Sequence, residues 1–96
     1  MTTADKLLTR YAVGIAFVAE EKPATTISDF TDQLRTAAEQ FERAGINGSD
    51  DLETAATYLD DANGNTDDTE RTVLLNRAAK NLAYANDMVG EYRDGA

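Results

Sequence analysis

Apolar residues recur along this chain at helical spacing. Three segments repeat one pattern: Leu34-x-x-Ala37-Ala38-x-x-Phe41-x-x-Ala44, Leu52-x-x-Ala55-Ala56-x-x-Leu59-x-x-Ala62 and Leu75-x-x-Ala78-Ala79-x-x-Leu82-x-x-Ala85. A related pattern, Leu8-x-x-Tyr11-Ala12-x-x-Ile15-x-x-Val18, precedes them. At about 100° per residue, such positions line up along one side of an α-helix. Duplication of one unit and convergence on bundle packing both explain the repeat, and either one predicts four helices that each bury a stripe.

Capping and stop signals set the boundaries of the predicted helices, which are residues 3–22, 26–44, 50–62 and 67–93. Each helix begins at a side chain that can cap it: Thr2 or Thr3, Thr26, Asp50 (with Glu53) and Asp67 (with Glu70). The stops are Pro23, Gly45 and Asn63-Gly64. A chain of 96 residues has room for one core. We therefore expect one all-α domain over residues 1–96, a small four-helix bundle with short connections and long first and fourth helices.

The first predicted helix has apolar residues on two sides. Its inward stripe leaves Val13 and Phe17 on roughly the opposite side, beside Ala16. A helix that is apolar all round is buried all round, and in a chain of this size the three other helices can hardly cover both sides. We therefore expect a protein partner or a second copy of the chain to contact Val13 and Phe17. The alternatives are that this helix is the central element, or that Phe17 is an ordinary exposed apolar residue.

The fourth predicted helix adds further candidates for an interface. Tyr84, Met88 and Tyr92 lie toward the flank of its stripe, where aromatic and Met side chains either meet partners or complete cores. The helix also holds four of the nine basic residues: Arg71, Arg77, Lys80 and Arg93. These cations can dock an acidic partner or pair with carboxylates of neighbouring helices. We expect pairing, because the rest of the chain is so acidic.

The composition excludes most catalytic chemistry. The chain has no Cys and no His, which removes thiolate and imidazole nucleophiles, bases and metal ligands. Carboxylate pairs such as Asp60-Asp61 are adjacent in sequence, so on a helix they point about 100° apart and make poor acid/base dyads. We therefore expect no enzyme and no cofactor.

The charge is strongly negative. Eighteen acidic residues against nine basic ones give a net charge of −9, which disfavours direct binding of nucleic acid. Three Lys among many acids, with abundant Thr and Ala, resemble proteins of halophiles that accumulate salt. The longest apolar run, Tyr11 to Ala19, is too short to cross a bilayer, so no membrane span is expected. The N-terminus shows no signal peptide, and we expect a cytoplasmic protein, or a virion component if a virus encodes it.

One loop places oxygen-bearing side chains at alternate positions, as calcium loops do: Asp61, Asn63, Asn65 and Asp67. The loop departs from the calcium-binding pattern at Thr66, where glycine is needed, and at Thr72, where a bidentate Glu is needed. A helix stop followed by a helix start explains the same residues. These four residues are therefore weak metal candidates.

Together these observations favour a small acidic interaction or assembly subunit without catalytic activity, oligomeric or bound to a larger partner. The candidate interface is Val13, Phe17, Tyr84, Met88 and Tyr92. The alternatives are a calcium-binding helical module, a connector-type component of a virus particle, and an acidic mimic of nucleic acid.

Overall fold

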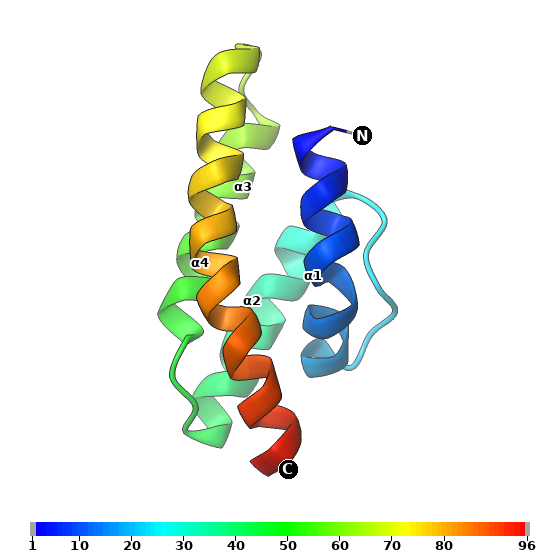
Figure 1. Ribbon diagram of the computed structural model, residues 1–96, viewed down its shortest axis with the longest axis vertical. Coiled ribbons are helices and arrows are strands. Elements are labelled where there is room, and N and C mark those ends of the chain that lie inside the picture. Colours follow the sequence, from blue (N-terminus) through cyan, green and yellow to red (C-terminus); the bar gives the residue numbers. More distant parts are fainter. Residues whose placement is uncertain (1, 96) are drawn as a thin grey trace.

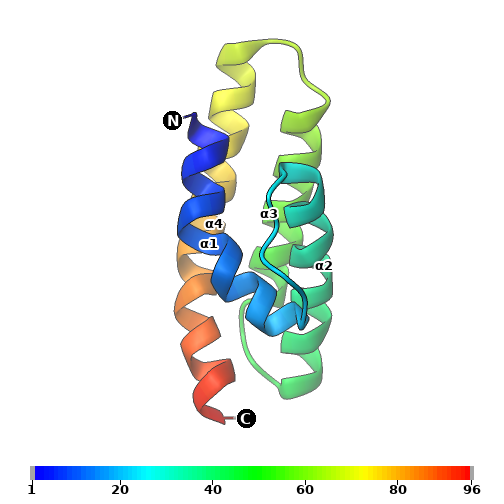
Figure 2. The ribbon, with the colours of Figure 1, turned by 90° about the vertical axis from the view of Figure 1, so that its right-hand side faces the viewer.

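The protein is an all-α four-helix bundle, as the sequence pattern predicts. The computed structural model describes residues 2–95, and this part of the chain contains no strand (Figure 1). Its helices are α1 (Thr3–Ala19), α2 (Ile27–Ala44), α3 (Ser49–Asn63) and α4 (Asp68–Gly95). Each helix packs against two neighbours, in the cyclic order α1, α2, α3, α4, so α1 and α3 stand at diagonal corners (Figure 2).

Three of the four helices run in the same direction. Figures 1 and 2 show α1, α2 and α4 descending together while α3 ascends. The contacts agree, because Gly14 of α1 approaches Asn86 of α4 and Phe17 approaches Tyr92, so residue numbers increase in parallel along both helices. Short connections favour antiparallel neighbours. The parallel pair α1 and α2 therefore requires a different kind of connection.

That connection is the extended segment 20–26, which returns along α1. Pro23, Ala24 and Thr25 line a hollow together with Leu8 and Ala12 of α1. A helix of 17 residues is about 25 Å long, and seven extended residues reach about 23 to 25 Å. The segment is thus long enough to bring the start of α2 back beside the start of α1.

Most of the expected helix ends are confirmed. Thr2 caps α1 in a reciprocal box with Asp5, and the hydroxyl of Thr26 accepts the Asp29 N–H at 3.1 Å. The Asp67 carboxylate accepts the N–H groups of Thr69 and Glu70 at the start of α4. Gly45 ends α2 in the left-handed conformation, with φ of 71°. Local signals of one or two residues therefore determine these ends.

The expected end of α1 is wrong by three residues. Glu20 takes the left-handed conformation with φ of 59°, and its N–H returns to the last turn of the helix. Pro23 restricts Lys22 to extended backbone, and the Lys22 carbonyl accepts the Gln33 amide at 2.6 Å, which ties the returning segment to α2. The first helix consequently has 17 residues against 18 in α2, so it is not especially long.

The expected cap of α3 is also wrong. The helix begins at Ser49, and its N-cap is Gly48, which has φ of 116° and offers no side-chain hydrogen bond. Asp50 lies in the first turn, where a carboxylate is favourable beside the helix N-terminus. The acidic residue thus stabilises this end by its charge and not by capping.

The predicted stripes form the core. The α3 stripe is buried along its whole length, and Phe30 and Phe41 of α2 are completely buried. Alanines on α2, α3 and α4 let the helices approach closely, and the stripe positions on α1 from Tyr11 to Val18 are also buried. Three stripe positions differ, because Leu8 and Ala79 are half-buried and Ala44 is exposed at the end of α2.

Candidate functional site

The outer side of α1 carries two large exposed apolar residues. Val13 is 69% exposed and Phe17 is 50% exposed. Lys6, Arg10, Val13 and Phe17 are spaced by four, three and four residues, so they form one exposed line along the helix. Ala16 was expected beside Phe17 on this side, but it is buried. The outer line of α1 is therefore narrow, with its basic half toward the N-terminus and its apolar half toward the C-terminus.

Phe17 is held in place by an aromatic contact with α4. Its ring meets the edge of the Tyr92 ring with centroids 6.2 Å apart, and Tyr92 stacks on buried Phe41 at 5.9 Å. Such pairs add about 0.5 to 1.5 kcal/mol beyond simple burial. Phe17 thus presents a fixed apolar surface to solvent.

A line of mostly small or uncharged residues on α4, ending at Arg93, lies beside the outer line of α1. It consists of Thr72, Asn76, Ala79, Ala83, Asn86, Gly90 and Arg93, spaced by four and three residues. Its position is fixed at two points. Thr72 borders a cavity shared with the start of α1, and the Asn86 Oδ1 lies only 3.2 Å from where a Cβ on Gly14 would be. We call the two lines together the α1/α4 face.

The α1/α4 face differs in charge from the rest of the molecule. Its two lines hold three basic residues, Lys6, Arg10 and Arg93, and exposed carboxylates lie at their ends, at Asp68 and Glu20, and beside the α4 line, at Asp87 and Asp94. In contrast, α3 has five acidic residues and no basic residue: Asp50, Asp51, Glu53, Asp60 and Asp61. Because α1 and α3 are diagonal, the bundle is electrically polarised across its width.

The structure does not gather the five expected interface residues into one patch. Val13, Phe17 and half-buried Tyr92 lie together at the junction of α1 and α4. Met88 is half-buried against Gly48, and exposed Tyr84 borders a hollow at the start of α3. Helical spacing alone did not separate the two sides of α4. The small residues Ala79, Ala83 and Gly90 distinguish the side of α4 that lies beside α1.

The expected pairing of the α4 cations is not seen. Between residues 2 and 95 the ion pairs are Arg35 with Asp60, which joins α2 to α3, and Arg71 with Asp68, within α4. The hydrogen bond to Asp60 raises the pKa of Arg35. No ion pair in this range joins α4 to a neighbouring helix, so Arg93 on the α1/α4 face is open to solvent.

The weak metal candidates serve the turn between α3 and α4 instead. Asn65 accepts the Asp67 N–H at 2.8 Å and donates to Glu70 at 2.9 Å. Asp67 caps α4, while Asp61 and Asn63 belong to the last turn of α3 and are exposed. Within residues 2–95 no group of three or more carboxylates is arranged to hold a metal ion. The Oδ1 atoms of Asn65 and Asp67 thus accept backbone N–H groups of the turn and of α4.

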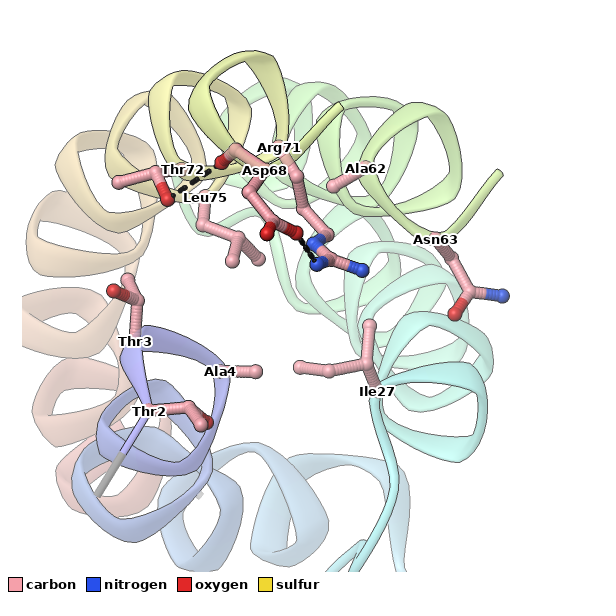
Figure 3. Close-up of a pocket in the computed structure, with 10 residues that line it drawn as sticks. All are labelled: Thr2, Thr3, Ala4, Ile27, Ala62, Asn63, Asp68, Arg71, Thr72 and Leu75. Carbon is pink, nitrogen blue, oxygen red and sulfur yellow. Dashed lines mark hydrogen bonds and ion pairs between the residues drawn. The ribbon is translucent and has the colours of Figure 1, made fainter. Parts of the chain in front are cut away.

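A cavity of about 550 Å³ opens at the end of the bundle where α1, α2 and α4 begin (Figure 3). Ala4, Ile27 and Leu75 point into it, and Arg71 reaches across its mouth to Asp68. The Thr72 hydroxyl donates to the Asp68 carbonyl at 2.9 Å. Three of its polar residues, Asp68, Arg71 and Thr72, therefore bind one another.

No helix in the described part of the chain is both long and apolar enough to cross a membrane. Comparison with models of protein families, with characterised proteins and with solved structures finds no match to this chain.

Proposed function

We propose that this protein is an interaction subunit without catalytic activity, and that it binds another protein surface through the α1/α4 face. The observation that supports this proposal is the pair Val13 and Phe17, exposed on a face that also holds Lys6, Arg10 and Arg93, in a chain with eighteen acidic residues. Aromatic residues and arginine are enriched at protein interfaces, whereas acidic residues are depleted. The face thus combines an exposed aromatic residue, Phe17, with the arginines Arg10 and Arg93, as interfaces do.

The chemistry of the face indicates the chemistry of its partner. Val13 and Phe17 supply apolar area, and fully burying such a side chain is worth roughly 1.5–3 kcal/mol. Arg10 and Arg93 can each form a bidentate pair with a carboxylate. The partner surface should therefore combine an apolar hollow with acidic residues around it.

Site-specific photocrosslinking tests the proposed function. A photoreactive phenylalanine analogue at position 17 should give a crosslinked product in cells that produce the protein, because Phe17 is exposed and aromatic. The matched control is the same analogue at Glu39, an exposed position on α2 outside the face. A product of any mass from position 17 but not from position 39 supports the proposal. Equal products from both positions, or none from position 17, would reject it.

A further inference from the structure

We infer that the occupant of the α1/α4 face is a second copy of this chain, docked head to tail with the start of its α3 against the face. This inference rests on the interaction function proposed above and names the partner. The contact would place Phe17 and Arg10 of one copy against Tyr84, Asp50 and Asp51 of the next.

Charge complementarity favours this arrangement. The outer line of α1 presents the cations Lys6 and Arg10, and α3 presents five carboxylates without a base. Two copies that met through the same face would oppose cations with cations. A face docked on the α3 side of another copy opposes cations with carboxylates, which guides both approach and orientation.

The start of α3 has a hollow into which side chains of the α1/α4 face of another copy would dock. A hollow of about 440 Å³ lies between the α2–α3 turn, the first turn of α3 and α4. Ile46 and Tyr84 provide apolar area, and Asp50 and Asp51 provide carboxylates at its border. This volume is within the range of side-chain and ligand pockets. The hollow thus offers apolar area beside carboxylates, and Phe17 and Arg10, two helical turns apart on α1, offer an aromatic ring and a guanidinium.

The overall charge of −9 does not oppose such a contact at moderate salt. The bundle measures 22 × 17 Å across its two shorter axes. The Debye length at 0.1 M salt is about 10 Å, so charges on the far side of each copy are largely screened. The facing charges therefore determine whether two copies attract or repel each other.

Two different surfaces that meet make a heterologous contact, which continues as an open chain or closes as a ring. Each copy then has a donor surface, the α1/α4 face, and an acceptor surface, the start of α3. The two surfaces can be disabled separately. This property separates the inference from symmetric pairing and from binding of a foreign protein.

The test uses one variant for each surface. Phe17→Asp disables the donor surface and Tyr84→Lys disables the acceptor surface; both residues are about half exposed, so both variants should keep the helix content of the wild type. Light scattering at about 0.1 M salt should find the wild type at multiples of 10.4 kDa and each variant at one chain mass. An equimolar mixture of the two variants should give twice the chain mass, because each retains the surface that the other lacks.

The control is Ser28→Asp, which adds a carboxylate to an exposed position in the first turn of α2 and should assemble like the wild type. If Phe17→Asp loses helix content, Val13→Asp replaces it, because Val13 is 69% exposed. A wild type that is monomeric up to about 1 mM, or a mixture of variants that stays monomeric, would overturn the inference. Crosslinking of Phe17 to a foreign protein with a monomeric wild type would reject self-assembly and leave the proposed function intact.

Discussion

The helices α1 and α3 bury similar stripes but present opposite outer sides. Along α3 the stripe is completely buried, and its solvent side is polar and carries five acidic residues. The stripe of α1 is also buried, yet its solvent side presents Val13 and Phe17 beside Lys6 and Arg10. Contacts of α1 with its neighbours are also less extensive than those of α3. The comparison teaches that inward stripes specify the bundle, whereas the outer sides give each helix a different surface chemistry.

The largest expected effect is the difference in stability between a substitution on the buried side of α1 and one on its exposed side. Ile15→Asp should unfold the domain, because Ile15 is 1% exposed and a carboxylate there loses its hydration without gaining a partner. Phe17→Asp, two residues away, should leave helix content nearly unchanged. Circular dichroism and thermal melting of both variants measure the difference. Unfolding by Phe17→Asp of a chain that was monomeric beforehand would assign Phe17 to the core and contradict its role as an interface residue.

A second prediction compares Gly14, inside α1, with Gly48, the N-cap of α3. Gly48→Ala should destabilise the fold by about 1–2 kcal/mol, because φ of 116° strains any residue with a Cβ and Phe41 lies 3.3 Å from that Cβ. Gly14→Ala should stabilise it by about 0.5 kcal/mol, since Ala favours a helix interior and exposed Asn86 can move aside. Denaturant midpoints should therefore shift in opposite directions. Shifts of the same sign would contradict this account of the two sites.

The melting temperature should depend on salt through the carboxylates of α3 more than through the cations of α1. We propose that the acidic surface is an adaptation to high salt, so the melting temperature should rise between about 0.05 and 2 M KCl as self-repulsion is screened. Neutralising two exposed α3 carboxylates, with Glu53→Gln and Asp61→Asn, should reduce this rise by several degrees. The matched variant Lys6→Gln on α1 should not reduce it. A melting temperature that does not change with KCl would reject the adaptation.

The smallest expected effect concerns the start of α1. Hydrogen bonds from Thr2, first from its side chain and then from its backbone N–H, lower the pKa of the Asp5 carboxyl. Because the folded pKa lies below the unfolded one, this stabilisation is present above about pH 4 and is lost as the pH falls through the folded pKa. Asp5→Asn should therefore lose stability more slowly than the wild type between about pH 5 and 3. Identical acid titrations of stability would show that the box does not contribute.

The sequence was sufficient for features that depend on neighbouring residues. The stripes and the caps at Thr2, Thr26 and Asp67 were predicted because helical spacing and capping act within one or two turns. The direction of α2 was not predicted, because it depends on the path of segment 20–26. A tight turn would make α2 antiparallel to α1, whereas a segment that runs back along α1 makes the two helices parallel. Similarly, the contact of Phe17 with Tyr92 joins residues from the two ends of the chain. A pattern along one helix does not determine which helix lies beside it.

The returning segment also changes the balance of helix dipoles. In a bundle whose helices alternate in direction, the four helix dipoles cancel. Here three helices run one way and one runs the other, so the equivalent of two helix dipoles remains. Their sum is about one elementary positive charge at the end where α1, α2 and α4 begin. Each of these helices has an acidic residue in its first turn, at Asp5, Asp29 and Asp68. Part of the acidity of this protein therefore neutralises a field that its own topology creates along the bundle axis.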